Sequence, residues 1–239
     1  MLWNFISAMR AGDGIEMANL MAKLAGMVFV LLFCLSVHEC AHAWAAKKLG
    51  DSTAYNHGRL TLNPGKHLDP IGSLMILLVG FGYAKPVPVN PRNFKHYKKG
   101  MALTAAAGPL SNLLMGILFG IAACAAYLLN LRFPSDLAGL LVRFFGAIFT
   151  SNIGLMVFNL IPIPPLDGAR LLDLVLPARV SDFLARYERY MMYGVMLLLF
   201  FRVLDLPLSW LVLSISKLIV WPFAALFGVA AWPMLYALL

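Results

Sequence analysis

The sequence predicts an all-α polytopic membrane protein with about five to six transmembrane helices. We expect a three-helix core, a small membrane-associated β region, a re-entrant segment and further helices toward the C-terminus. Two observations support this class. Of the 239 residues, 61% are hydrophobic and only 13% are charged, about half the charged share of an average soluble domain. Several apolar runs also approach or exceed the roughly 20 residues that a helix needs to cross a bilayer.

Three long apolar segments form the expected core. The first runs from about 18 to 49 and stops before Gly50, a residue that suits a helix C-cap. The second covers about 100–129, with an interruption at Gly108-Pro109, and the third covers about 137–160. The chain then divides into an interfacial N-terminal segment (1–18), a membrane core (19–175) and C-terminal transmembrane helices (176–239), with spans at about 190–204 and 208–239.

The segment between the first two spans changes character. Within residues 51–69, Arg59-Leu60-Thr61-Leu62 and the turn-forming Asn63-Pro64-Gly65 indicate short strands with a tight turn. The apolar run 70–83 is short for a spanning helix and rich in glycine, so it suits a re-entrant segment. Residues 84–91 contain three prolines, which predict an extended loop.

Positive charge is concentrated in three polar segments, although the net charge of the chain is only +8. Basic residues favour cytoplasmic loops, so we expect these segments on the cytoplasmic side. No stripe of basic and aromatic residues indicates a nucleic-acid partner. The three cysteines lie in apolar segments and form no disulfide framework. The basic groups are Lys47, Lys48, Arg59 and Lys66; Lys85, Arg92, Lys95, Lys98 and Lys99; and Arg170, Arg179, Arg186 and Arg189.

The most informative motif is His38-Glu39-Cys40-Ala41-His42, inside the first apolar segment. On a helix, His38 and His42 project from one face and can bind the same metal ion. Glu39 points about 100° round the helix and could act on a metal-bound water without being a ligand. The alternative is that both histidines only form hydrogen bonds within a helix bundle. Ionisable side chains are costly in an apolar helix, which favours the functional interpretation.

A zinc hydrolase site usually needs a third protein ligand. Asp167 follows the proline-broken end of the third span, where irregular backbone can line a polar cavity. It could instead be the N-cap of a short following helix. By residue type, His57, His67 and His96 are rival ligands, but they lie in loop or strand segments.

Asn112 is a candidate catalytic residue in the second span, four positions after Gly108. Its amide could stabilise the oxyanion that forms when a peptide carbonyl is attacked. It could also bridge two helices, which is the commoner role of asparagine in membranes. Asn159 admits the same two interpretations, with the structural one favoured.

Three motifs in this order resemble those of the site-2 protease family of intramembrane zinc metalloproteases. They are the segment 38–42, Gly108-Pro109-Leu110-Ser111-Asn112, and the segment 159–168 with its Leu166-Asp167-Gly168. The segments 58–64 and 85–91 are also similar to those of compact bacterial members. The resemblance covers about residues 20–175.

The resemblance implies a three-helix catalytic core with one zinc ion held by His38, His42 and Asp167. Glu39 would be the general base, and Asn112 would hold the substrate or the oxyanion. Substrates would be transmembrane proteins, such as membrane-anchored regulators or remnant peptides, which add to the 51–83 region as an extended strand. The expected setting is the plasma membrane of a prokaryote, with the site toward the cytoplasm and a possible homo-oligomer. No PDZ or CBS domain is expected.

Two other functions remain open. A membrane metal-ion transporter could use the same His/His/Asp site, but Glu39 would have no necessary role, and no inverted repeat is visible. A pseudoprotease acting as a membrane chaperone would not need the intact motif. Hydrolysis needs water, so we also expect a polar channel from the cytoplasmic side near Asp167.

Overall fold

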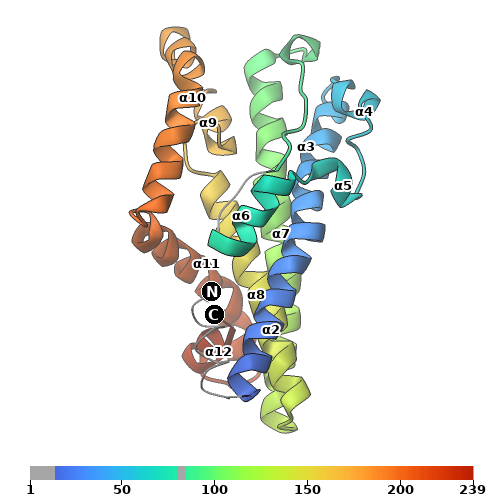
Figure 1. Cartoon of the computed structure of the whole chain (residues 1–239), viewed down its shortest axis with the longest axis vertical. Coiled ribbons are helices and arrows are strands. Elements are labelled where there is room, and N and C mark those ends of the chain that lie inside the picture. Colours follow the sequence, from blue (N-terminus) through green and yellow to red (C-terminus); the bar gives the residue numbers. More distant parts are fainter. Residues whose placement is uncertain (1–13, 80–83, 239) are drawn as a thin grey trace.

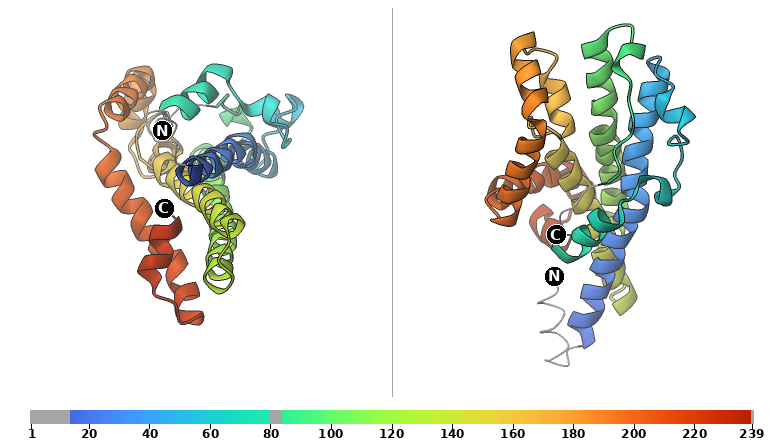
Figure 2. Two further views of the ribbon diagram at one scale, coloured as in Figure 1. Left: turned by 60° about the horizontal axis from the view of Figure 1, so that its bottom comes forward. Right: turned by 45° about the horizontal axis from the view of Figure 1, so that its top comes forward.

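The computed structural model describes residues 14–79 and 84–238, and most of these residues are helical. Figures 1 and 2 show an elongated bundle in which the first long helix, α7 and α8 run side by side. Helix α10 stands at the opposite flank, and α11 returns across the base. The longer elements are α2 (Gly14–Phe29), α3 (Leu35–Lys48), α6 (Pro70–Val79), α7 (Tyr97–Arg132), α8 (Asp136–Asn159), α10 (Ala178–Phe200), α11 (Asp205–Leu226) and α12 (Ala231–Leu238).

Four helical stretches in the described part are long and apolar enough to cross a membrane: 14–48, α7, α8 and α11. The three core spans are therefore confirmed, whereas the described residues do not confirm the expected total of five to six. Most of the expected span at 190–204 belongs to α10, which ends at Phe200. The first half of this helix carries five charged residues: Arg179, Asp182, Arg186, Glu188 and Arg189. Its remaining apolar stretch is too short to cross the hydrocarbon core.

The first span is one continuous helical stretch with a π-helical turn, η1 (Val30–Cys34), between α2 and α3. A π turn inserts one extra residue and changes which residues face a neighbour, and such turns often lie near functional sites. The stretch ends as predicted at Gly50, whose φ of 109° suits glycine. The backbone N–H of Asp51 donates to the carbonyl of Ala46 (2.9 Å), which closes the helix end.

Helix α7 is continuous through Pro109, where an interruption was expected. Glycines on α7 allow close packing against α8: a Cβ at Gly116 would lie 2.7 Å from Ile153 Cδ1, and one at Gly120 would lie 3.0 Å from Phe149. Phe149 and Ile153 are fully buried, and they form one core with residues of α11 and α12.

The prediction of short strands within 51–69 is wrong. The described residues there form two short helices, α4 (Thr53–Asn56) and α5 (Pro64–His67), and the nearest strand-like pairing is a single bridge between Leu68 and Ala84. Asn63 explains the difference, because its side chain accepts a hydrogen bond from Gly65 N (3.0 Å) with Pro64 in the first helical position. Asn-Pro-Gly therefore starts a helical turn here instead of closing a hairpin.

Helix α6 is ten residues long and lies at the periphery of the bundle, outside the three core spans. Its length agrees with the expected short apolar segment, of which residues 80–83 lie outside the described residues. Residues 1–13 of the expected interfacial segment also lie outside them, and 14–18 already belong to α2.

Candidate metal centre

His38, His42 and Asp167 meet where α3 faces the start of α9 (Asp167–Leu172). The Nε2 atoms of the two histidines are 3.0 Å apart, and Asp167 Oδ2 lies 3.4 Å from each of them. Both histidines are buried. The structure thus brings together the three side chains that the sequence proposed as ligands, although Asp167 is more than a hundred residues away along the chain.

The spacing of these three atoms fits a tetrahedral zinc site. Ligand atoms about 2.0–2.2 Å from zinc in tetrahedral geometry lie roughly 3.3–3.5 Å from one another. The observed separations are 3.0, 3.4 and 3.4 Å. Asp167 Oδ2 is also buried without a hydrogen-bond partner among the described residues. A buried carboxylate oxygen needs such a partner or a cation, so the donor set suits a bound metal ion.

His42 is held in the form that can bind a metal. Its Nδ1 lies 2.8 Å from the backbone carbonyl of Thr104 on α7. A carbonyl only accepts hydrogen bonds, so Nδ1 carries a proton, and in the neutral ring the lone pair is then on Nε2, the nitrogen that faces Asp167. No sequence pattern indicates this contact, because the Thr104 backbone makes it and any residue type could supply the carbonyl.

His38 has a corresponding partner in Asn112, which is fully buried on α7. Asn112 Nδ2 lies 3.0 Å from His38 Nδ1, and Asn112 Oδ1 is buried without a partner in the described part of the chain. The amide that was predicted to be catalytic therefore contacts one of the two candidate ligand histidines, at the ring nitrogen that does not face Asp167.

Gly108 allows α7 to approach the two histidines. A Cβ at this position would lie 2.3 Å from His42 Nε2 and 2.6 Å from His38 Cε1. Real side chains do not approach so closely, so any larger residue would displace the imidazoles. Gly168, next to Asp167, also allows a close approach: a Cβ at this position would lie 2.2 Å from the carbonyl oxygen of Leu160. These contacts explain why glycine is needed in two of the three motifs.

Glu39 is buried on the same turn of α3, with 8% of its surface exposed. The rival ligands are elsewhere: His57 and His96 are exposed, and the buried His67 lies with Nε2 2.7 Å from the carbonyl of Thr61. The Asn159 amide donates to the carbonyl of Leu155 at 2.9 Å, which agrees with the structural interpretation.

A buried His/His/Asp group with a neighbouring glutamate, set among membrane-length helices, defines a membrane-embedded metal hydrolase. The comparisons with known proteins agree. Residues 134–202 match the model of peptidase family M50. The chain is 38% identical over 191 residues to YwhC of Bacillus subtilis (strain 168), whose name describes a zinc metalloprotease; the match covers 80% of this chain and 87% of YwhC.

A second relative is Rip2 of Mycolicibacterium smegmatis, also named as a zinc metalloprotease. It is 31% identical over 152 residues, which are 59% of this chain and 55% of Rip2. No solved structure matches the chain.

The chain belongs to peptidase family M50, the site-2 proteases, and is an intramembrane zinc metalloprotease. The transporter alternative is not favoured.

Proposed function

We propose that the enzyme cleaves peptide bonds within or near transmembrane segments of other membrane proteins, with His38, His42 and Asp167 as zinc ligands and Glu39 as general base. The observation that carries this proposal is the buried group of three ligand atoms on the helix that also bears Glu39.

Zinc, when bound, supplies a Lewis acid that polarises the scissile carbonyl and acidifies water. Glu39 takes a proton from the attacking water and later gives a proton to the leaving amine, so the base is regenerated. Thr104 holds the His42 ring through its carbonyl, and Asn112 fixes the His38 ring. Burial of Glu39 among helices limits competing water, which strengthens electrostatic interactions in the site.

We further propose that Asn112 acts on His38, not on the oxyanion. If His38 Nε2 binds the metal, His38 Nδ1 carries a proton and must donate it. The group that faces His38 Nδ1 must then be the amide oxygen of Asn112. Rotating the amide by 180° exchanges Oδ1 and Nδ2, and the two orientations occupy the same space. The hydrogen bond would fix the ring orientation, as outer partners of ligand histidines commonly do.

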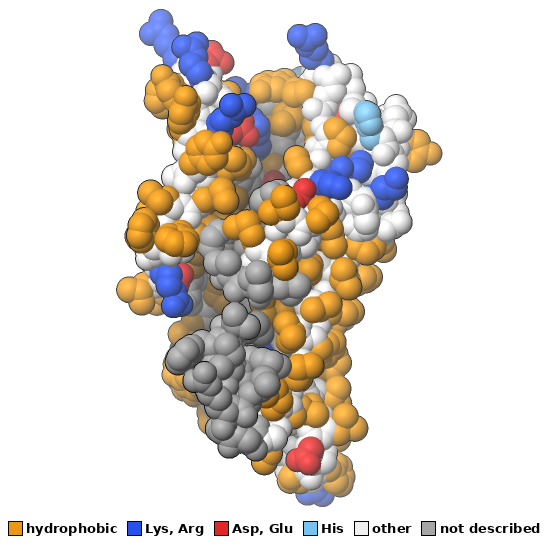
Figure 3. Space-filling model, in the orientation of Figure 1, with side chains coloured by type: hydrophobic (Ala, Val, Ile, Leu, Met, Phe, Trp, Pro, Cys, Tyr) orange, Lys and Arg blue, Asp and Glu red, His pale blue; other side chains and the backbone are white. Residues whose placement is uncertain are grey.

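The site faces the cytoplasm in this proposal, in the plasma membrane of a prokaryote. The three basic groups lie in loops and helix ends beyond the metal centre, and Figure 3 shows Lys and Arg side chains gathered at that end of the molecule. The positive-inside rule favours this orientation.

Membrane-anchored regulators and remnant peptides are the proposed substrates. A substrate helix must unwind before hydrolysis, and its backbone groups then need partners inside the membrane. The segment near the Leu68–Ala84 bridge, where Lys85 N donates to the His67 carbonyl at 2.8 Å, is the proposed place of strand addition.

The decisive experiment is Glu39→Gln in the detergent-solubilised enzyme. We expect this variant to keep its zinc and to lose cleavage of a co-reconstituted single-span substrate, because the amide cannot accept the proton. Zinc content and product formation are measured on the same preparation. Full cleavage by Glu39→Gln would refute the assignment of Glu39.

A further inference from the structure

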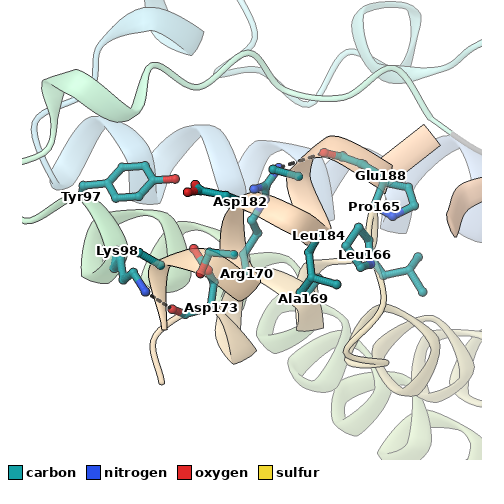
Figure 4. Close-up of a pocket in the computed structure, with 14 residues that line it drawn as sticks. Tyr97, Lys98, Pro165, Leu166, Ala169, Arg170, Asp173, Asp182, Leu184 and Glu188 are labelled. Carbon is teal, nitrogen blue, oxygen red and sulfur yellow. Dashed lines mark hydrogen bonds and ion pairs between the residues drawn. The ribbon is translucent and has the colours of Figure 1, made fainter. Parts of the chain in front are cut away.

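A cavity of about 320 Å³ lies beside the metal centre, between the start of α7, α9 and the first half of α10. Figure 4 shows its lining. Leu166 and Ala169, on either side of Asp167 in the sequence, form part of its wall, and none of the proposed zinc ligands lines it. The cavity is thus next to the site without being part of it.

The two cations of the cavity are already engaged. Lys98 Nζ donates to the carbonyls of Asp173 (2.9 Å) and Leu176 (2.7 Å), just beyond the end of α9. Arg170 forms an ion pair with Glu188, with Nη2 and Oε2 3.5 Å apart. This pair joins α9 to α10 across the cavity (Figure 4).

Two carboxylates of the lining have no such partner. The side chains of Asp173 and Asp182 form no hydrogen bond or ion pair with other described residues, and three acidic residues line the cavity against two basic ones. Pro164, Pro165 and Leu184 supply apolar wall. Apolar surface close to unpaired carboxylates suits a side chain with an aliphatic stem and a positive end. The exposed Arg179, Arg186 and Arg189 on the same half of α10 do not line the cavity.

We propose that this cavity binds a Lys or Arg side chain from the cytoplasmic flank of the substrate. The inference rests on the proposed function and deepens it. Transmembrane segments carry Lys and Arg at their cytoplasmic ends, so a substrate cut near Asp167 presents such residues on this side of the membrane. A few residues of extended substrate chain beyond the scissile bond would bring a Lys or Arg side chain to Asp173 and Asp182.

The test uses three reconstituted single-span peptides that are identical except for flanks of two Lys, two Gln or two Glu. We expect wild type to cleave the Lys peptide with about five- to tenfold higher kcat/KM than the Gln peptide, mainly through KM, and to disfavour the Glu peptide. The expected size of this preference is that of two partly exposed ion pairs, between the Lys side chains and Asp173 and Asp182. In Asp173→Asn/Asp182→Asn the Lys-to-Gln ratio should fall to about one. Asp136→Asn, at the far end of the bundle, is the matched control and should keep the wild-type ratio.

High salt gives an independent readout, since it screens exposed charges. The Lys-to-Gln ratio should fall when salt is raised from about 0.05 M to 0.5 M in wild type and stay flat in the double variant. Equal cleavage of Lys and Gln peptides by wild type, or an unchanged ratio in the double variant, overturns the inference and leaves the protease assignment intact. Cleavage of none of the peptides overturns the proposed substrate class and this inference with it.

Discussion

Asn112 Nδ2 lies 3.0 Å from His38 Nδ1, deep between α7 and α3, and Asn112 Oδ1 has no partner among the described residues. A second contact from α7 mirrors this one, because the Thr104 carbonyl lies 2.8 Å from His42 Nδ1. Helix α7 therefore supports both histidines from the side away from Asp167. The metal centre depends on the crossing of these two helices as well as on the His-Glu-x-x-His segment itself.

Asn112→Ala should weaken zinc binding about 10- to 100-fold, the usual effect of removing an outer partner of a ligand histidine. Asn112→Asp should bind zinc within a few-fold of wild type, because a carboxylate can accept the His38 Nδ1 proton. Saturating zinc should restore most of the activity of the Ala variant. Zinc affinity is measured by chelator competition, and kcat at several zinc concentrations.

The oxyanion role predicts the opposite pattern for Asn112. Loss of an oxyanion donor lowers kcat about 10²- to 10³-fold and should leave zinc affinity unchanged. The kcat of Asn112→Asp would then be as low as that of Asn112→Ala, since an ionised carboxylate cannot donate a hydrogen bond to the oxyanion. That result would refute the positioning role of Asn112.

Gly108→Ala should weaken the metal centre although it adds only one methyl group. The new Cβ would lie 2.3 Å from His42 Nε2, so the imidazole must move out of the ligand triangle. We expect zinc affinity to fall by at least about tenfold, with activity falling in parallel. Gly154→Ala on α8 is the control, because its Cβ would meet no atom within 4 Å. Normal zinc content in Gly108→Ala would show that α3 and α7 can move apart without a loss of zinc affinity.

Much of the site could be predicted because its signals are local. The spacing of His38 and His42 follows from helix periodicity, and Asp167 is a polar residue at a proline-rich helix end. The contacts made by Thr104 and Asn112 depend on where α7 crosses α3, which no local pattern specifies. The closeness of Gly108 to the imidazoles has the same origin.

The errors in the predicted fold have equally physical causes. Asn63-Pro64-Gly65 can start a helix or make a hairpin turn; in the structure it starts a helical turn, with Gly65 N donating to Asn63 Oδ1. The predicted span at about 190–204 leaves out the charged stretch before it, but this stretch and the apolar residues that follow belong to one helix, α10, because a helix need not stop at the membrane surface. Polarity alone therefore misplaces the start of this helix.

Asp167→Ala should lower zinc affinity by more than the roughly 10- to 100-fold expected for an outer partner such as Asn112, because the ion would keep only two of the three proposed protein ligands. Zinc content after dialysis against a weak chelator measures this. His67→Gln is a useful companion: His67 lies 2.7 Å from the Thr61 carbonyl and away from the ligand group, so it should affect stability and not zinc content. Undiminished zinc in Asp167→Ala, with loss in His67→Gln, would move the third ligand to His67.

Asp51 ties the loop before α7 to the end of α3, and its replacement should loosen that loop. Asp51 Oδ1 accepts hydrogen bonds from Thr53 N (3.0 Å) and Asn93 Nδ2 (2.7 Å), and Oδ2 accepts one from Asn90 N (2.7 Å). Asp51→Asn turns an N–H toward the Asn90 N–H, so we expect a loss of about 1–3 kcal/mol. Asp69→Asn is the matched control, because asparagine caps α6 as well as aspartate does.

The pH dependence of stability gives a second measurement on Asp51. Burial raises the pKa of its carboxyl group, but the hydrogen bonds from Thr53, Asn93 and Asn90 outweigh burial and hold the pKa below its usual value of 3.8. A carboxyl group with a lowered folded pKa stabilises the fold above its unfolded pKa and loses that contribution as pH falls through the folded value. The difference in unfolding temperature between wild type and Asp51→Asn should therefore be constant from about pH 8 to 5 and shrink below about pH 4. A difference that grows as the pH falls would show that Asp51 is protonated in the folded protein.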